Sequence, residues 1–146
     1  MKIKVAWIGK TKEPAIESLT DEYLKRLSRF AQVEGISLRN EAALLNLCNR
    51  RAQTKPYLVL LEAEGKQFSS EELAQFLDNH QQRSSQPLLF SIGPADGFTS
   101  SARQAAAQAL SLGKMTLTHE LARVVLLEQL YRAFTILQGH PYHTGH

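Results

Sequence analysis

The sequence predicts an α/β fold in which a mostly parallel sheet of about five strands is flanked by helices. Apolar, β-branched runs that suit strands alternate along the chain with stretches whose apolar residues recur at helical spacing. Two of the runs, 56–61 and 87–92, are almost wholly apolar, as is typical of central strands covered on both faces. No repeat, linker or low-complexity segment interrupts the pattern, so we expect one domain over residues 1–146.

The first half of the chain is predicted to hold a strand, a helix, a strand and a helix, at residues 3–8, 14–30, 33–38 and 42–53. Gly9 closes the first strand, and Pro14 opens the amphipathic helix that follows. Arg50 and Arg51 stand near the end of the second helix. We expect their charges to complement the negative end of its dipole.

The second half continues the alternation, with strands at 56–61, 87–92 and 114–117 and helices opening at 69, 102 and 118. Residues 62–66 are predicted to be an exit loop, and 79–86 a polar connection. Ser69 or Ser70 with Glu72 or Glu71 forms a capping-box pattern. The alanine-rich helix is expected to end near Leu110.

The final helix is expected to begin after Thr118 as its N-cap and to stop at Gly139 and Pro141. Between Leu121 and Leu137 it is apolar on almost every side. A narrow polar arc remains, formed by Glu128, Arg132 and Thr135. Glu128 precedes Arg132 by four residues, the favourable order for an ion pair.

A helix that is apolar all round must be buried on two sides, and one small monomer offers few elements to cover both. We therefore expect a homodimer built on helix 121–137. Arg123 lies among the apolar residues of this helix and leaves two interpretations open. It is either a snorkelling arginine whose stem covers apolar surface, or a cation held at an interface to bind an anionic partner.

Composition is that of a soluble globular protein, with 43% hydrophobic and 21% charged residues. The formal charge of +3 is compatible with RNA as a partner and does not require it. Cys48 is the only cysteine, so no disulfide framework is expected. No apolar run approaches the ~20 residues of a membrane span. We expect a protein of the reducing cytoplasm that needs no membrane.

Ligands of parallel sheets bind beyond the carboxyl ends of the strands. The segments that leave those ends near the middle of the sheet begin at Leu61, Gly93 and Leu112. They are made of glycine, proline, small and apolar residues with few charges. Such a composition favours a pocket for an adenine ring, with backbone groups and apolar walls, over a phosphate site.

The same segments carry a resemblance to a known family. Its residues are Ile92-Gly93-x-x-x-Gly97-Phe98, Leu112-x-x-x-Thr116-Leu117, Arg123-Val-x-Leu-x-Glu128-x-Leu-Tyr-Arg-Ala133 and Pro141-Tyr-His143. Together with the Met1-Lys start and the Gly9 turn, they make the whole chain resemble the RlmH family. These are SPOUT-class methyltransferases that act on a pseudouridine of large-subunit ribosomal RNA.

The resemblance implies a single SPOUT domain whose C-terminal part is threaded into a trefoil knot, and a homodimer through the last helix. It also implies that S-adenosylmethionine binds in the knot. The implied cofactor contacts are Leu61, Gly93, Leu112, Gly113, Lys114, Met115, Thr116 and Leu117. The sequence departs from the family pattern at Pro94, which replaces a second glycine and removes an N–H donor. It departs again at Thr144-Gly145-His146, where a basic residue is usual.

The reaction implied is methyl transfer to N3 of a pseudouridine in 23S ribosomal RNA, which we expect to be reached in the assembled ribosome. The N3 proton must leave, and His143 is the candidate acceptor. Tyr142 is placed to stack on the base, and Arg132 or Arg123 to orient the nucleotide or stabilise imide charge. The tail 139–146 would then face the substrate, whereas its sequence alone also suits a disordered terminus.

Two alternatives concern function. The spacing of His140, His143 and His146 invites a metal, but a tail interrupted by glycine and proline is poorly suited to hold one, so no metal is expected. The chain could also be a catalytically inactive ribosome- or RNA-binding protein that retains the knotted fold, because Pro94 and the altered tail have removed activity. Binding of S-adenosylmethionine would distinguish an enzyme from this inactive binding protein.

Overall fold

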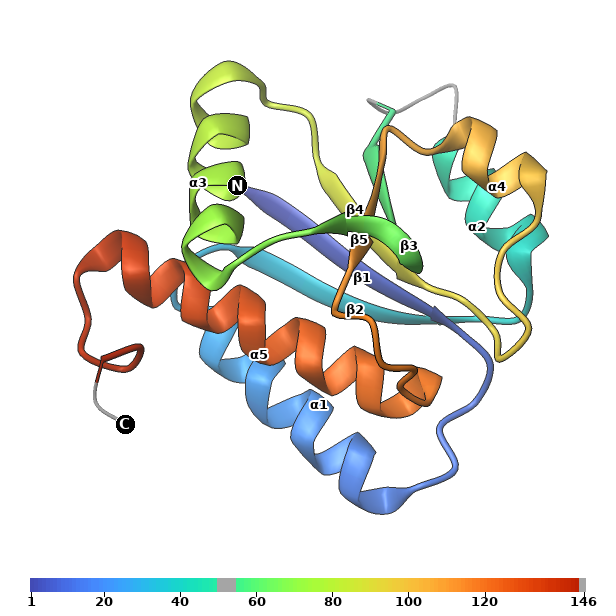
Figure 1. The fold of residues 1–146 in the computed structure, drawn as a ribbon, viewed down its shortest axis with the longest axis horizontal. Helices are drawn as coiled ribbons and strands as arrows, with labels where there is room; N and C mark the ends of the chain where they lie inside the picture. Colours follow the sequence, from blue (N-terminus) through green and yellow to red (C-terminus); the bar gives the residue numbers. More distant parts are fainter. Residues whose placement is uncertain (50–54, 145–146) are drawn as a thin grey trace.

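The computed structural model describes residues 1–49 and 55–144, and it confirms the predicted fold class. Along the chain the elements are β1 (Lys2–Ile8), α1 (Pro14–Leu27), β2 (Gln32–Leu38), α2 (Glu41–Cys48), β3 (Tyr57–Gln67), α3 (Ser70–Arg83), β4 (Leu88–Ile92), α4 (Ser100–Ala105), β5 (Gln108–Ser111) and α5 (His119–Gln138). The strands pair in parallel, in the order β2-β1-β4-β3-β5 (Figure 1).

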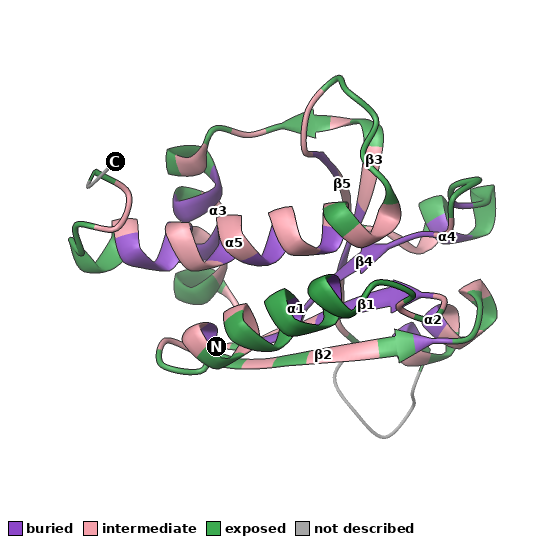
Figure 2. Ribbon diagram, turned by 90° about the horizontal axis from the view of Figure 1, so that it is seen from below, coloured by how far each residue is buried: buried purple, intermediate pink, exposed green. Residues whose placement is uncertain are grey.

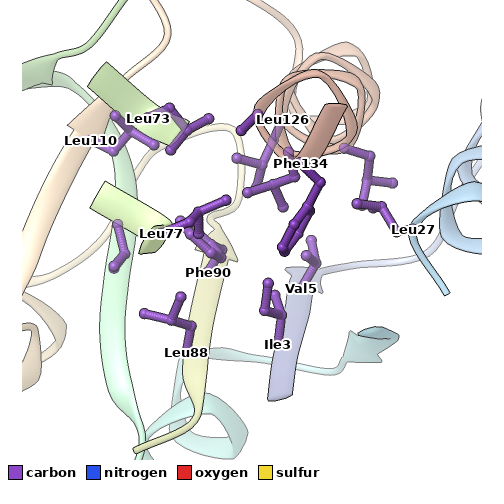
Figure 3. Packing of buried hydrophobic residues seen from close by; sticks show 14 of the residues in the cluster. Ile3, Val5, Leu27, Leu73, Leu77, Leu88, Phe90, Leu110, Leu126 and Phe134 are labelled. Atoms are coloured by element: carbon purple, nitrogen blue, oxygen red, sulfur yellow. The ribbon is translucent and has the colours of Figure 1, made fainter. Parts of the chain in front are cut away.

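The helices cover both faces of this sheet, and each face has its own core. Leucines of α1, α3 and α5 pack with Val5 and Phe90 on one face (Figure 3). Leu44 of α2 and Ala102 of α4 pack with Leu89 on the other face. Every residue of β4 is buried, as its apolar sequence predicts for a central strand (Figure 2). The sheet thus holds the ends of β3, β4 and β5 in a fixed arrangement.

The predicted helix caps are confirmed. Ser69 Oγ accepts the Glu72 N–H at 3.0 Å, and Glu72 Oε1 accepts the Ser69 N–H at 2.8 Å, which completes a capping box before α3. Thr118 Oγ1 accepts the Leu121 N–H at 3.2 Å and opens α5. Gly139 ends α5 in the left-handed conformation, with φ of 70°.

The prediction was wrong between residues 102 and 117. The alanine-rich helix ends at Ala105, and β5 begins at Gln108 where we expected helix. The Ala107 N–H donates to the Leu58 carbonyl at 2.9 Å, so pairing with β3 outweighs the helix propensity of alanine. Residues 114–117, predicted as a strand, form the loop between β5 and α5 instead.

Other helix and strand boundaries also differ from the predicted ones. The exit loop expected at 62–66 continues β3, whose pairing with β5 shifts register between Leu61 and Lys66. Helix α1 stops at Leu27 instead of Phe30, and α3 runs to Arg83 through part of the expected polar connection. Helix α2 ends at Cys48 with Asn49 as its C-cap, and residues 50–53 of its predicted span, with Arg50 and Arg51, lie outside the described residues.

Helix α5 packs against α1 and α3 as well as β4. These neighbours within the chain bury much of the apolar surface that we assigned to a partner. Thr135 is fully buried and its hydroxyl donates to the Arg132 carbonyl at 2.6 Å, so it does not belong to an exposed polar arc. The expected Glu128–Arg132 ion pair is confirmed at 2.7 Å. No helix within the described residues is long and apolar enough to span a membrane.

Candidate functional site

A cavity of about 410 Å³ opens at the carboxyl ends of β4 and β5, beside residues 61–64 of β3, and lies within the size range of small-ligand sites. Its walls come from the segments predicted from sequence, which follow Leu61, Ile92 and Ser111. The predicted cofactor residues that line it are Leu61, Gly93, Leu112, Gly113, Met115, Thr116 and Leu117. Lys114 belongs to the same loop but does not line the cavity.

The wall after β4 is a tight turn that folds back on itself. Gly97 has φ of 85°, and its N–H donates to the Pro94 carbonyl at 2.9 Å. The turn places the Phe98 ring against Gly93, where an added Cβ would lie 3.0 Å from the ring. Only glycine fits here without displacing Phe98. Pro94 contributes a carbonyl acceptor to this turn and offers no N–H.

The wall after β5 is shaped by Ser111 and Gly113. Ser111 Oγ accepts the Gly113 N–H at 3.1 Å and donates to the Gly113 carbonyl at 2.9 Å. Gly113 has φ of 144°, outside the range that side-chain-bearing residues favour. Beyond it, Met115 is 86% exposed and Leu117 39% exposed. Large apolar side chains in such a position indicate a surface that a ligand or a second subunit covers.

Charged residues that the sequence prediction missed lie at the rim of this cavity. Glu62, Glu64 and Asp96 line it, and Arg103 donates to Glu62 at 2.8 Å. His119, in the first turn of α5, also lines it. The sequence placed all three carboxylates after a predicted central strand; in the structure Asp96 follows β4, whereas Glu62 and Glu64 lie within the longer β3. The cavity therefore combines apolar walls with a mainly acidic rim.

The tail is docked against the chain and is not a disordered terminus in its described part, 139–144. The Tyr142 hydroxyl donates to Glu128 Oε2 at 2.8 Å and lies 3.4 Å from the Tyr23 hydroxyl. Its ring packs edge-on against Tyr131, with centroids 4.7 Å apart. Burial raises the pKa of Tyr142, and hydrogen bonds with Tyr23 and Glu128 raise it further. The phenol is therefore held in its neutral, donating form.

His143 and Arg132 also take part in the contacts that hold the tail. His143 Nε2 lies 2.8 Å from Glu71 Oε1, and its Nδ1 lies 3.4 Å from Arg132 Nη1. The pKa of Glu71 is lowered by its own backbone N–H and by His143, and the hydrogen bond to Glu128 raises the pKa of Arg132. We call the group Tyr23, Glu71, Glu128, Arg132, Tyr142 and His143 the tail network. Gly145 and His146 lie outside the described residues.

Arg123 does not fit either interpretation made from sequence. It is 1% exposed, its guanidinium carbon lies 4.0 Å from the centre of the Trp7 ring, and its Nη1 donates to Thr20 Oγ1 at 3.3 Å. Burial lowers its pKa, while Glu120 and Glu17 act in the opposite direction. A side chain enclosed in this way can neither snorkel nor contact RNA, so the substrate role given to Arg123 was wrong.

The cavity and the tail network occupy different parts of α5. His119 and Ala122 of its first turn line the cavity, whereas Glu128 and Arg132 hold the tail. At 1.5 Å per residue, His119 and Arg132 are about 20 Å apart along the helix axis. The candidate substrate residues of one chain are therefore remote from the candidate cofactor residues of that chain.

Comparisons with known proteins agree with the fold. A family model described as "Predicted SPOUT methyltransferase" matches residues 1–143. Ribosomal RNA large subunit methyltransferase H of Koribacter versatilis is 60% identical over 146 residues, 100% of both chains. The protein of the same name from Geobacter sp. strain M21 is 43% identical, over 98% of this chain and 99% of its own.

Among solved structures, the SpoU methyltransferase AviRb of Streptomyces viridochromogenes, in complex with AdoMet, matches 95% of this chain and 59% of its own with a TM-score of 0.57. Its identity to this chain is 14%, so this likeness concerns the fold alone. The trefoil knot stays a prediction. The match of the family model to nearly the whole chain and the full-length relatives establish that the protein belongs to the SPOUT methyltransferase family.

Proposed function

We propose that this protein transfers the methyl group of S-adenosylmethionine to N3 of a pseudouridine in large-subunit ribosomal RNA. The observation that carries the proposal is the cavity beside β3 and at the ends of β4 and β5, in a chain whose full-length relatives are named ribosomal RNA large subunit methyltransferase H. The cytoplasm, where ribosomes work, is the corresponding compartment.

The cavity fits the cofactor in shape and charge. Gly93 leaves open the space that a side chain would fill beside Phe98, and Leu61 and Leu117 provide apolar walls. S-adenosylmethionine carries a positive sulfonium and an ammonium group, which suit the carboxylates of Glu64 and Asp96 at the rim. When bound, it supplies a methyl group that is open to in-line attack.

The tail network supplies groups for the substrate. Tyr142 can stack on the base, and Arg132 can orient the nucleotide and stabilise negative charge on the imide. His143 can accept the N3 proton at a ring nitrogen. In the docked conformation one of these nitrogens faces Glu71 and the other faces Arg132. The tail must therefore change its contacts before His143 reaches a base.

The distance between tail and cavity supports a homodimer. Because His119 and Arg132 of one chain lie about 20 Å apart along α5, a second chain is the simplest source of a tail near each cavity. Leu121 of α5 is 48% exposed, and its chain neighbour Ala122 lines the cavity together with the exposed Met115 and Leu117. A dimer through residues 121–137 would cover this apolar surface and bring each tail towards the partner's cavity.

A direct experiment is to measure methyl transfer from labelled S-adenosylmethionine to three substrates: assembled ribosomes, large subunits and free ribosomal RNA. Mass analysis of ribosomal RNA from cells with and without the gene then locates the modified nucleotide. We expect one methyl group to depend on the gene and assembled particles to be the better substrate. Transfer to none of the three would contradict the proposal.

Pro94 favours one second candidate, a ribosome-binding protein without activity. Proline offers no N–H at the position where the family usually has glycine. Calorimetry with S-adenosylmethionine separates the two functions. Binding at one site per chain supports the enzyme, and ribosome binding without cofactor binding supports the inactive protein.

A further inference from the structure

A second cavity, of about 480 Å³, lies between α3 and the β3–β5 edge of the sheet. It shares no lining residue with the cofactor cavity. Four aromatic side chains line it: Tyr57, Phe68, Phe76 and His80. Two cations, Lys66 and Arg83, line it as well. We call this feature the α3 groove.

The aromatic side chains of the α3 groove form one connected surface. The ring of Tyr57 lies 5.3 Å from that of His80 and 6.1 Å from that of Phe76, and Phe68 continues the series at 5.8 Å from Phe76. Each of the four is half-buried, so the core fixes part of the ring and the remainder stays accessible. Every nucleobase has a π face, so a fixed aromatic surface binds bases with little dependence on sequence.

The charges of the α3 groove favour an anion. Lys66 and Arg83 are exposed, and neither forms an ion pair within the described part of the chain. The acidic member is Glu72, whose carboxylate accepts the Ser69 N–H at the positive end of α3. This hydrogen bond lowers the pKa of Glu72, so its carboxylate stays ionised. The two cations outnumber this one carboxylate, so the net charge of the lining is positive.

The α3 groove also adjoins the tail network. Glu71, which contacts His143, is the chain neighbour of Glu72, which lines the groove. Gln129 of α5 accepts a hydrogen bond from Ser70 at 2.6 Å and fixes this end of α3 beside the helix that carries the tail. A strand held by the tail would have the groove next to it.

We propose that the α3 groove binds a single-stranded segment of ribosomal RNA near the modified nucleotide. Bases stack on Tyr57, Phe76 and His80, and phosphates pair with Lys66 and Arg83. Gln75 and Asn79, which are hydrogen-bonded to each other at 2.8 Å, offer amide groups to base edges. This inference rests on the proposed function, because it takes ribosomal RNA as the substrate.

The test uses the full-length protein with both cations reversed, Lys66→Glu and Arg83→Glu. Both side chains are exposed, so the fold is expected to persist. KM for the ribosomal substrate should rise about tenfold or more, while kcat and S-adenosylmethionine affinity stay unchanged. The slope of log affinity for a labelled ribosomal RNA fragment against log salt should become shallower by about 0.7 for each lost single-strand phosphate contact.

Two further variants separate charge from stacking. Arg39→Glu reverses an exposed arginine that follows β2, at the opposite edge of the sheet, and should leave KM and slope as in wild type. Phe68→Leu shortens the aromatic surface at similar volume. It should weaken RNA binding several-fold with an unchanged salt slope, because no phosphate contact is lost.

The outcomes distinguish this inference from the proposed function. If the wild-type enzyme is active and the Lys66→Glu, Arg83→Glu variant keeps the wild-type KM and salt slope, the inference about the groove is overturned. The proposed function would still stand. A wild-type protein that methylates no ribosomal RNA would overturn the function, and fragment binding would still decide on the groove. A changed sedimentation mass in the variant would show that the groove is a protein interface and would also overturn the inference.

Discussion

The guanidinium carbon of Arg123 lies 4.0 Å from the centre of the Trp7 ring, enclosed between α5, α1 and β1. Its Nε and the Trp7 Nε1 are buried and have no hydrogen-bond partner among the described residues. A buried cation that makes only some of its possible hydrogen bonds lowers the stability of the fold. Packing and the cation–π contact must offset this loss. The side chain of Arg123 thus links α5 to β1 and α1.

The Trp7 contact leads to a prediction for Arg123→Met. Replacement of a buried, incompletely paired charge by an apolar side chain of similar length should be neutral or should stabilise the protein by about 1–4 kcal/mol. Arg123→Ala should instead destabilise it by roughly 2–4 kcal/mol, because it leaves a cavity. Urea unfolding measures both changes. A steep loss of RNA affinity in Arg123→Met, with stability unchanged, would show that the side chain leaves this position to bind RNA.

The tail network predicts the effect of Tyr142→Phe. Loss of the hydroxyl removes the hydrogen bond to Glu128 and leaves that half-buried carboxylate with fewer partners. We expect faster hydrogen exchange in residues 140–144 and a loss of about 1 kcal/mol in tail docking. Thr144→Ala is the matched control, because among the described residues that hydroxyl donates to the Pro141 carbonyl, at 3.3 Å, and not to Glu128. Equal exchange in the two variants would contradict this account of docking.

The Glu71–His143 contact gives the docked tail a dependence on pH. The folded chain lowers the pKa of Glu71 below its ordinary 4.5, first through its own backbone N–H and then through His143. The contact is therefore present above pH 4.5 and is lost as pH falls through the lowered pKa. Exchange of the tail amides should increase across that range. In Glu71→Gln this acid-induced increase should be smaller, and an unchanged profile would assign it to other groups.

The turn after β4 predicts a paired effect at Gly93 and Phe98. Gly93→Ala places a methyl group 3.0 Å from the Phe98 ring, so both thermal stability and S-adenosylmethionine affinity should fall. Adding Phe98→Leu makes room for the methyl group and should restore part of the stability, with coupling of about 1 kcal/mol between the sites. Calorimetry measures the S-adenosylmethionine affinity of the same variants. Additive effects of the two changes would show that the ring does not limit Gly93.

Local chemistry explains which features the sequence could predict. The caps at Ser69 and Thr118 depend on neighbours in the chain, and the cavity follows from the rule that ligands bind at the carboxyl ends of parallel strands. Resemblance to a family pointed to the same segments. The missed features depend on distant partners. Strand β5 forms because an alanine-rich segment meets the edge of β3.

The contacts of the tail and of Arg123 were also missed because they depend on residues distant in the sequence. Tyr142 docks against Tyr23, 119 residues away, and Arg123 is enclosed by Trp7 and Thr20, over 100 residues away. Periodicity within a helix states which side a residue occupies but does not identify what covers that side. For this reason the sequence did not predict that Tyr142 and His143 of the tail contact Glu128 and Arg132 of α5.

The tail and the cavity of one chain lie far apart, which leads to a prediction for dimers made of two different variants. Gly93→Val should inactivate the cofactor cavity, and deletion of residues 142–146 should remove the tail, so each variant alone should be inactive. If each tail serves its partner's cavity, a mixed dimer contains one cavity and one tail that are both intact and face each other. Random exchange of subunits makes half of the dimers mixed, so activity should return to about a quarter of wild type.

The measurement is methyl transfer before and after the two variants are mixed, with subunit exchange followed by sedimentation and mass. Mixing either variant with itself is the control and should restore nothing. Recovery would show both that the protein is a dimer and that its sites are shared. If exchange is complete and no activity returns, the tail acts on the cavity of its own chain and must travel the length of α5 to reach it. A monomer in sedimentation at micromolar concentration would contradict the proposed dimer itself.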